Sequence, residues 1–487
     1  MNHFDIQINQ SQHSSKTTSN DASPTPDKSN DHVVIESDKK KHNSMISKLN
    51  NFFYGYSVSI IPIITKIHET IYESEDDWIT SLLSSSIFVG SLAGLIIFGI
   101  LGDRLGRAKG IRICMVINLI GILGSTFSFS VFSLSVPEMF IIFRIITGIG
   151  NGGMIPLTIV LSSESEQKDK KKTGVILGLL QSFGWLLGPV CLYIYFLFFS
   201  SSSFTLYNYL WRIVIFIPII APLYTLWSPI YETHINTNKS NINDYISSVF
   251  QYKYLVLLIG TGGVYLLYDI ISYGMTMISP YILSQVINLE NTPKDTAFSI
   301  IISGIFGTVG QLLSFQMIKR FSLRIILLQS FIINSTLFYG TSYFINTSVN
   351  PLFLLFIYYM TFFITNYGPG TVTILLPPLL YPSSIRTTYY AFSAGMGKIG
   401  AIIGSGLSIN ILTHYGINNL LYLCTIISIL GYLTTIFFIP RETETENETK
   451  NTSTNVNQKE LERILFICQQ EAKNMELKMK KMIKETV

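Results

Sequence analysis

The chain alternates between long apolar runs and short polar segments. A helix of about 20 mainly apolar residues spans the roughly 30 Å hydrocarbon core of a membrane, because such a helix satisfies its backbone hydrogen bonds internally. Twelve runs follow this pattern, of which the first is the weakest, and each predicts one membrane-spanning helix. The runs cover residues 52–66, 78–101, 111–132, 137–161, 173–199, 209–227, 254–283, 297–318, 325–344, 351–380, 389–413 and 418–439.

The polar segments between the runs alternate in charge. Basic residues follow the even-numbered runs, for example Arg104 and Arg107 after the second run and Lys319 and Arg320 after the eighth. The segments after the odd-numbered runs are acidic or nearly neutral, as around Asp76. Because lysine and arginine favour the cytoplasmic side of a membrane, we expect a multi-pass protein with both termini in the cytoplasm. The sequence leaves open which membrane holds it.

A polar segment rich in Asn and Ser follows the sixth run and divides the runs into two sets of six. We therefore expect an all-α membrane protein with twelve transmembrane helices in two six-helix bundles. Parallel halves of this kind place a substrate site near mid-depth between them. The expected parts are a disordered N-terminal tail (1–49), a first bundle (50–230), a linker (231–253), a second bundle (254–440) and a C-terminal tail (441–487) with helical apolar spacing over 458–483.

The composition supports a membrane protein and excludes several other classes. Hydrophobic residues make up 48% of the chain and charged residues only 13%, whereas soluble domains carry about 25% charged residues. The net charge of +4 is too small and scattered to predict a nucleic-acid partner. The four cysteines lack metal-ligand spacing, so we expect them to be packing residues. We see no catalytic constellation and expect neither enzymatic activity nor a cofactor.

The segment after the second run reads Gly102-Asp103-Arg104-Leu105-Gly106-Arg107. Its glycines permit a tight turn, and its charges can form charge-assisted bonds with the ends of neighbouring helices. Such bonds can break and re-form as two bundles rock. The segment resembles the signature loop of the major facilitator superfamily, which implies a twelve-helix transporter fold with Asp103, Arg104 and Arg107 as gating residues. An ordinary basic loop is the alternative.

The fourth run carries Arg144 and then a stripe of glycines, namely Gly148, Gly150, Gly152 and Gly153. A charged residue within a membrane span suggests a functional role. Arg144 lies close to the outer end of its run, where its long side chain could reach the interface. Small residues at fixed spacing predict a helix-packing surface. We add Arg144, Glu164 and Arg386 to the predicted gating residues.

Several stretches of the second half are similar to the phosphate:proton symporter family. They are Asn366-Tyr367-Gly368-Pro369-Gly370-Thr371 and Ser393-Ala394-Gly395-Met396-Gly397-Lys398, together with Tyr265, Asp269 and Tyr273-Gly274. Gln181 in the fifth run fits the same family. The resemblance implies phosphate transport by symport. It also implies a substrate site formed by Lys398, Asp269, Tyr265, Gln181, Tyr367 and Asn366.

The ionisable residues deepest in the second half also suit an anion carrier. Lys398 offers three donors to an anionic group, and Asp269 could neutralise it when the site is empty or titrate with it. Tyr265 lies one turn from Asp269 on the same helix face and could orient ligand oxygens. The alternative is a static pair between Asp269 and Lys398 that only fixes helix packing.

The first half departs from the symporter pattern. Family members carry aspartates in the first span and in a Gly-Gly-Asp-Tyr-Pro-Leu-Ser stretch of the fourth, whereas this chain has Tyr54-Gly55-Tyr56-Ser57 and Gly152-Gly153-Met154-Ile155. Those carboxylates are associated with proton coupling and phosphate contact, and a methionine cannot bind a proton.

Three hypotheses therefore remain. The leading one is alternating-access transport of a small anionic solute, such as phosphate, an organic phosphate or a carboxylate, with or without a coupling ion. A second is a facilitator of a neutral or cationic metabolite such as a sugar, a vitamin or an organic cation. A third is a nontransporting receptor or scaffold whose tails bind partners.

Overall fold

The computed structural model describes residues 28–72, 77–130, 134–165, 170–199, 204–230, 250–287, 290, 292–345, 347, 349–382 and 385–441. Only the backbone is described for residues 28–40, 77, 103–105, 163–165 and 170. The predicted C-terminal helix (458–483) and most of the predicted linker lie outside the described residues.

Helices dominate these ranges, and most begin and end close to the predicted apolar runs. They are α1 (Lys28–Ser59), α2 (Ile61–Tyr72), α3 (Asp77–Leu105), α4 (Arg107–Thr126), α5 (Val136–Ser165), α6 (Lys170–Phe198), α7 (Phe204–Phe216), η1 (Ile217–Ile219), α8 (Ile220–Trp227), α10 (Tyr252–Ile287), α11 (Pro293–Met317), α12 (Leu323–Ile345), α13 (Pro351–Tyr367), α14 (Pro369–Leu380) and α15 (Arg386–Phe438).

Within the described residues, ten helical segments are long and apolar enough to cross a membrane. One of them, α15, is two helices joined at Gly416, whose φ of 78° is not helical. The pair α1 and α2 supplies the weak first run, interrupted near Pro62 because proline lacks a backbone N–H. The ten segments, the second helix within α15 and the α1–α2 pair together match the twelve predicted runs.

Two predicted boundaries differ from the structure. Helix α1 begins at Lys28, within the segment expected to be a disordered tail, and Asn43 and Ser47 are buried. Ser47 donates to the Thr158 carbonyl of α5 at 3.2 Å, so polar residues before the first run are ordered by tertiary contacts. At the other boundary α10 begins at Tyr252, so the end of the predicted linker is helical.

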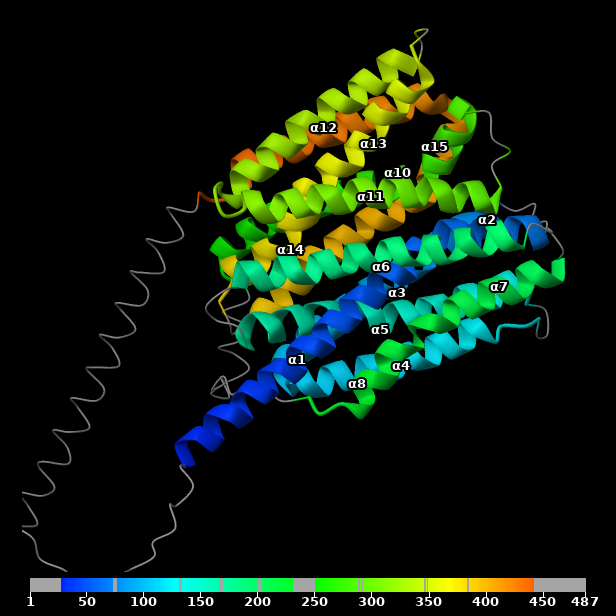
Figure 1. Ribbon diagram of the computed structural model, residues 1–487. Coiled ribbons are helices and arrows are strands. Elements are labelled where there is room, and N and C mark those ends of the chain that lie inside the picture. The colour runs from blue at the N-terminus through cyan, green and yellow to red at the C-terminus, as the bar shows by residue number, and fades with distance from the viewer. Residues whose placement is uncertain are drawn as a thin grey trace, which may run out of the picture.

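The helices before the linker pack mainly on one another, and so do those after it (Figure 1). In the first set α5 contacts α3 and α4, while α1 runs along α6. In the second set α15 contacts α10 and α12, and α13 contacts α11. The main contacts between the sets join α3 with α15 and α6 with α11, and smaller ones join α2 with α11 and α6 with α14. We call the first set the N half and the second the C half.

The glycine stripe in α5 is a packing surface, as predicted. A Cβ added at Gly148 would lie 2.3 Å from the Ile87 carbonyl oxygen of α3, and one at Gly152 would lie 2.1 Å from that of Ser91. Only glycine allows the two backbones to approach this closely.

Two turns identify the ends of the molecule. Gly106 joins α3 to α4 with φ 92°, a left-handed conformation that favours glycine. Gly416 joins the two helices of α15 at the opposite end. We call these the Gly106 end and the Gly416 end. Between them, large apolar side chains such as Ile96, Ile213 and Phe437 are exposed, as lipid contact requires.

Candidate substrate-binding site

A buried ion pair joins α10 and α15 of the C half. Lys398 Nζ donates to Asp269 Oδ2 at 3.2 Å and to the Tyr273 hydroxyl at 3.4 Å. Lys398 is 3% exposed and Asp269 is 1% exposed. An isolated charge is costly to bury, so each residue requires the other in this position. The pair agrees with the expectation that Asp269 could neutralise Lys398 in the empty site.

Aromatic rings from both halves surround the ammonium group of Lys398. Its Nζ lies 5.9 Å from the ring centroid of Tyr54 in α1, 5.6 Å from that of Phe88 in α3 and 5.0 Å from that of Tyr273 in α10. Ring faces attract cations at these distances. Because Tyr54 and Phe88 belong to the N half, the pair lies at the seam between the halves, where relative movement would change its surroundings.

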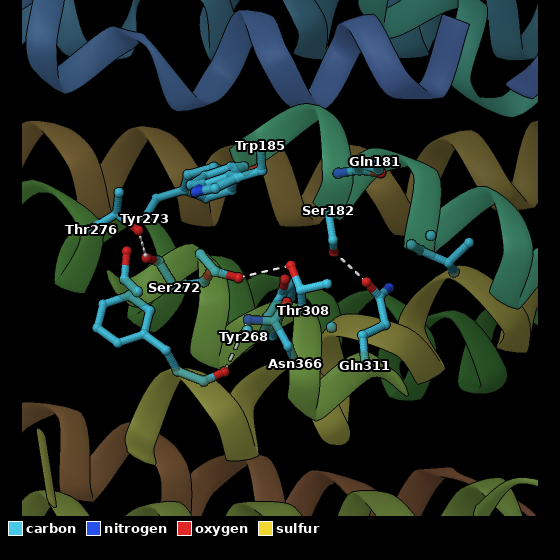
Figure 2. Close-up of a pocket in the computed structure, with 17 residues that line it drawn as sticks. Gln181, Ser182, Trp185, Tyr268, Ser272, Tyr273, Thr276, Thr308, Gln311 and Asn366 are labelled. Atoms are coloured by element: carbon cyan, nitrogen blue, oxygen red, sulfur yellow. Dashed lines mark hydrogen bonds between the residues drawn. The ribbon is translucent and has the colours of Figure 1, made fainter. Parts of the chain in front are cut away.

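A cavity lies beside this pair, between α6 of the N half and α10, α11, α13 and α14 of the C half (Figure 2). Its volume is about 60 Å³, and a single water needs roughly 10–15 Å³. The cavity can therefore hold several waters or part of a small solute. Its lining residues are Gly178, Gln181, Ser182, Trp185, Tyr268, Ser272, Tyr273, Thr276, Ser303, Gly304, Gly307, Thr308, Gln311, Phe362, Asn366, Gly370 and Ile374.

The lining is polar but uncharged. Amides and hydroxyls dominate it, and none of the 17 lining residues is Lys, Arg, Asp or Glu. Tyr273 connects the cavity to the ion pair, since it lines the cavity while its hydroxyl accepts from Lys398. The Trp185 ring lies 6.2 Å from that of Tyr273, so both halves contribute to this end of the cavity.

A bond between the halves lies toward the opposite end of the cavity. Ser182 of α6 donates to the Gln311 amide oxygen of α11 (Figure 2). A Cβ added at Gly178 would lie 2.6 Å from Gln311 Nε2, so glycine at that position makes room for the amide. Gln311 therefore lies directly against α6 and links the two halves through the cavity wall.

The structure brings together four of the six predicted substrate-binding residues. Lys398 and Asp269 form the pair, while Gln181 and Asn366 line the cavity. Tyr265 is buried against Gly397, one turn from Asp269, and does not line the cavity.

Tyr367 also lies apart from the cavity. Its hydroxyl donates to Gln329 of α12 at 3.2 Å, on the side of α13 that faces another helix of the C half. The reason is that Asn366 and Tyr367 are adjacent on one helix, so they point in directions about 100° apart.

Arg144 does not reach the membrane interface, and that prediction is wrong. The side chain is 3% exposed and donates to the Ser57 carbonyl of α1 at 3.0 Å. Helix α1 ends two residues later, at Ser59, and the interruption leaves a carbonyl for the guanidinium to bind. Arg144 also lies 5.8 Å from the Phe140 ring centroid. It therefore holds α5 against the first span in the N half.

Most of the other predicted gating residues lie at the Gly106 end. Asp103 and Arg104 occupy the last turn of α3 and Glu164 the last turn of α5, but their side chains are outside the described set. Arg107 begins α4, and Arg386 begins α15 with its Nε donating to the Tyr381 carbonyl at 3.1 Å. Their gating role stays a prediction.

Sequence reasoning missed the residues that line the cavity from α11. Ser303, Gly307 and Gln311 recur every four residues, and Gly304 and Thr308 repeat the same spacing. Residues four apart share a helix face, so this stripe of small and polar residues in an apolar run was a signal that could have been found. Ser182 and Trp185, close to Gln181 in α6, are the matching residues of the N half.

Among the described residues, no group of three or more His, Cys, Asp or Glu side chains could hold a metal ion. Cys114 and Cys424 are buried packing residues, as expected, whereas Cys191 is exposed and that prediction is wrong for it. Cys468 lies outside the described residues.

The sequence profile of the Major Facilitator Superfamily matches residues 49–379. Among curated proteins, the chain is 24% identical over 398 residues to inorganic phosphate transporter PT2 of Toxoplasma gondii, covering 79% of this chain and 69% of the relative. It is 25% identical over 480 residues to probable inorganic phosphate transporter 1-6 of Arabidopsis thaliana, covering 81% and 90%. Glycerophosphoinositol transporter 1 of Saccharomyces cerevisiae is 25% identical over 411 residues, covering 80% and 77%.

Solved structures show the same arrangement of helices. The proton:xylose symporter XylE bound to 6-bromo-6-deoxy-D-glucose superposes with a TM-score of 0.65 and 18% identity, covering 83% of this chain and 97% of that chain. The human organic anion transporter MFSD10 gives a TM-score of 0.60 and 12% identity, covering 81% and 99%. At these identities the likeness concerns the fold alone.

Proposed function

The chain belongs to the major facilitator superfamily, and we propose that it moves a small anionic solute carrying a phosphate group by alternating access between its two halves. In this proposal residues 50–230 and 254–440 form two six-helix bundles, and both termini lie in the cytoplasm. The basic segments after the even-numbered spans support this orientation.

The observation that carries the proposal is the Lys398–Asp269 pair at the seam of the halves, next to a polar cavity. A phosphate oxygen arriving at the Tyr273 end can accept from Lys398, which then exchanges one anionic partner for another. The pair keeps the empty site neutral, so the halves can return without a bound solute. Relatives named as inorganic phosphate and glycerophosphoinositol transporters support a phosphate group on the solute.

The test is uptake of labelled inorganic phosphate and labelled organic phosphates into proteoliposomes that contain the purified chain. We expect Lys398→Ala to reduce uptake of the transported anion at least about tenfold, which corresponds to about 1.4 kcal/mol of lost interaction. The matched control is Lys172→Ala, because Lys172 is exposed at the Gly106 end of α6. Equal uptake by the two variants would refute the role assigned to Lys398.

In this proposal, any coupling of uptake to protons depends on Asp269. Among the described spans, Asp269 is the buried carboxylate. The symporter family has an aspartate in its fourth span, but this chain has Met154 there, which is 1% exposed and cannot titrate. We therefore expect Asp269→Asn to abolish any stimulation of uptake by an inward proton gradient. Persistent stimulation in this variant would place the proton elsewhere.

A second candidate function follows from the uncharged cavity. Amides and hydroxyls can bond the hydroxyl groups of a neutral polyol, and aromatic rings can cover its apolar face, without any cation in the lining. A facilitator of a neutral solute would be stabilised against heat by sugars or polyols alone, whereas the anion transporter requires a phosphate or carboxylate group. Thermal unfolding of the purified chain across both sets of compounds separates the two.

A further inference from the structure

Two tyrosine hydroxyls close to the ion pair have no hydrogen-bond partner among the described residues. They belong to Tyr54 in α1 and Tyr390 in α15, whose side chains are 3% and 0% exposed. Most buried polar groups in folded proteins are paired, because burying an unpaired one costs stability. Phenylalanine would fill almost the same space without that cost. A partner that is present in only part of the transport cycle would explain both hydroxyls.

Tyr54 is held at the seam by contacts of its own helix with the rest of the N half. A Cβ added at the neighbouring Gly55 would overlap the Gln181 carbonyl oxygen, so glycine lets α1 pack directly against α6. Three residues after Tyr54, the Ser57 carbonyl accepts from Arg144 of α5. These contacts fix α1 beside the cavity, and Tyr54 therefore moves with the N half.

The Tyr54 side chain faces the ion pair from the N half. The Lys398 ammonium lies 5.9 Å from the centroid of the Tyr54 ring. The Tyr54 hydroxyl is close to both Lys398 and Tyr273 but forms no regular hydrogen bond with either. Tyr273 also lines the cavity. An anionic oxygen that enters from the cavity and accepts from Lys398 therefore comes within reach of the Tyr54 hydroxyl.

Tyr390 is placed to serve the other member of the pair. It lies two turns before Lys398 on α15, and its hydroxyl is near both Lys398 and Asp269. When Lys398 turns to an anion, the Asp269 carboxylate loses the donor that now lies at 3.2 Å. A carboxylate only accepts hydrogen bonds, and a phenol has one O–H to donate. The Tyr390 hydroxyl can then donate to Asp269.

The charge of an entering anion makes such donors necessary. The Lys398–Asp269 pair is neutral, and none of the residues that line the cavity is cationic. A bound anion therefore adds a net negative charge to a buried site, where an uncompensated charge is costly. Hydrogen bonds to an ionised group are roughly twice as strong as those between neutral groups. Two free phenol donors offset part of this cost.

Resting on the proposed function, we propose that the Tyr54 and Tyr390 hydroxyls are donors used only when the anion is bound. Tyr54 donates to the anionic group beside Lys398, and Tyr390 donates to Asp269 once Lys398 has turned to the anion. The anion then bonds Tyr54 of the N half and Lys398 of the C half at once, which draws the halves together around the solute. Tyr54 is a substrate-binding residue in this scheme, and Tyr390 is a positioning residue.

The experiment removes one hydroxyl oxygen at a time. Full-length wild type, Tyr54→Phe and Tyr390→Phe are compared by thermal unfolding and by initial rates of uptake in proteoliposomes, with inorganic phosphate and glycerol 3-phosphate as probes. We expect the unliganded Tm of each variant to equal or exceed that of the wild type, because the empty protein loses no hydrogen bond. We expect KM to rise about tenfold in Tyr54→Phe and about threefold in Tyr390→Phe, and kcat to change less than twofold.

Tyr56→Phe is the matched control. Tyr56 is a buried tyrosine of the same helix, and its hydroxyl donates to the Val214 carbonyl of α7 at 3.2 Å. Loss of that bond should lower the Tm, while KM stays within twofold of the wild type. The control should therefore lose stability and keep its affinity, whereas Tyr54→Phe should keep its stability and lose affinity.

The outcomes separate this inference from the proposed function. If Lys398→Ala weakens a probe while both tyrosine variants bind it as the wild type does, the two hydroxyls have no role in anion binding and the anion transporter stands. A clear fall in the unliganded Tm of both variants would also overturn the assignment, since the hydroxyls would then be bonded in the empty protein. If neither probe binds the wild type and Lys398→Ala changes nothing, the proposed function fails and this inference fails with it.

Discussion

Lys398 Nζ lies 3.2 Å from Asp269 Oδ2, and the pair links α10 to the first helix of α15 near the midpoint of each helix. Both residues are almost fully buried. The stability of the C half and the proposed anion binding therefore depend on the same contact, and the two roles can be separated by substitution.

Removing one partner of the pair should cost more than removing both. Lys398→Ala or Asp269→Leu leaves a buried charge unpaired, at a cost of about 3–5 kcal/mol, whereas replacement of both by apolar residues is often close to neutral. We expect each single variant to lower the Tm by several degrees and Lys398→Met with Asp269→Leu to recover most of it. Thermal unfolding measures stability, and uptake by the double variant should stay as low as that of Lys398→Ala. A double variant as unstable as the singles would contradict this account.

Gly99 of α3 packs directly against Ala391 of α15, toward the Gly106 end. A Cβ at Gly99 would lie 2.3 Å from Ala391 Cβ, far inside contact distance, and Thr388 donates to the Gly99 carbonyl at 3.1 Å. We expect Gly99→Ala to push α3 from α15, to slow uptake severalfold and to make a cysteine at Thr387 react faster with thiol reagents.

A compensating substitution at Ala391 is the control for this steric argument. Ala391→Gly added to Gly99→Ala removes the clashing methyl group and should restore closure and uptake, because the roughly 1 kcal/mol cost of the new helix glycine is offset by the glycine removed from α3. Gly340→Ala should change neither, because nothing lies within 4 Å of that position. A double variant no better than Gly99→Ala would show that the clash is not the cause.

The halves also touch at the Gly416 end, where Ser84 of α3 donates to the Ser405 carbonyl of α15 at 3.4 Å. Alternating access requires this contact to open in each cycle. In a chain whose native cysteines are replaced, we expect a bifunctional thiol reagent to join Ser84→Cys to Ser405→Cys and to block uptake until a reductant cleaves it. Single-cysteine variants serve as controls. Full uptake by the cross-linked protein would mean that this end does not open.

His68 is a buried packing residue at the Gly416 end of the N half. It is 1% exposed, neither ring nitrogen has a partner among the described residues, and the rings of Phe140 and Trp211 lie 5.0 and 4.8 Å away. An unsatisfied buried polar group costs about 1–3 kcal/mol. We therefore expect His68→Phe to preserve or raise the Tm and to leave uptake unchanged.

A smaller residue at this position should have the opposite effect. His68→Ala opens a cavity among the rings and should lower the Tm by several degrees, since cavities destabilise packed interiors. Loss of uptake in His68→Phe, with the protein still folded, would instead indicate that the imidazole takes part in transport.

Much of the architecture followed from local properties of the chain. The length of an apolar run reports a membrane span because the bilayer has a fixed thickness, so the runs near α3 to α6 and α10 to α13 were recognised directly. The join inside α15 was also predicted, as two separate runs around His414. The pairing of Asp269 with Lys398 was foreseeable because buried charges need partners and the C half has few candidates.

The tertiary structure decided what the runs do not encode. Gln311 and Ser182 are 129 residues apart in the chain and meet only because α11 of one half packs against α6 of the other. Arg144 is held inside rather than at the interface because the interrupted first span presents the Ser57 carbonyl to it. A sequence read along one helix at a time gives the depth of each residue in the membrane. Which neighbour it faces depends on how the helices rotate and pack, and that is a property of the assembled halves.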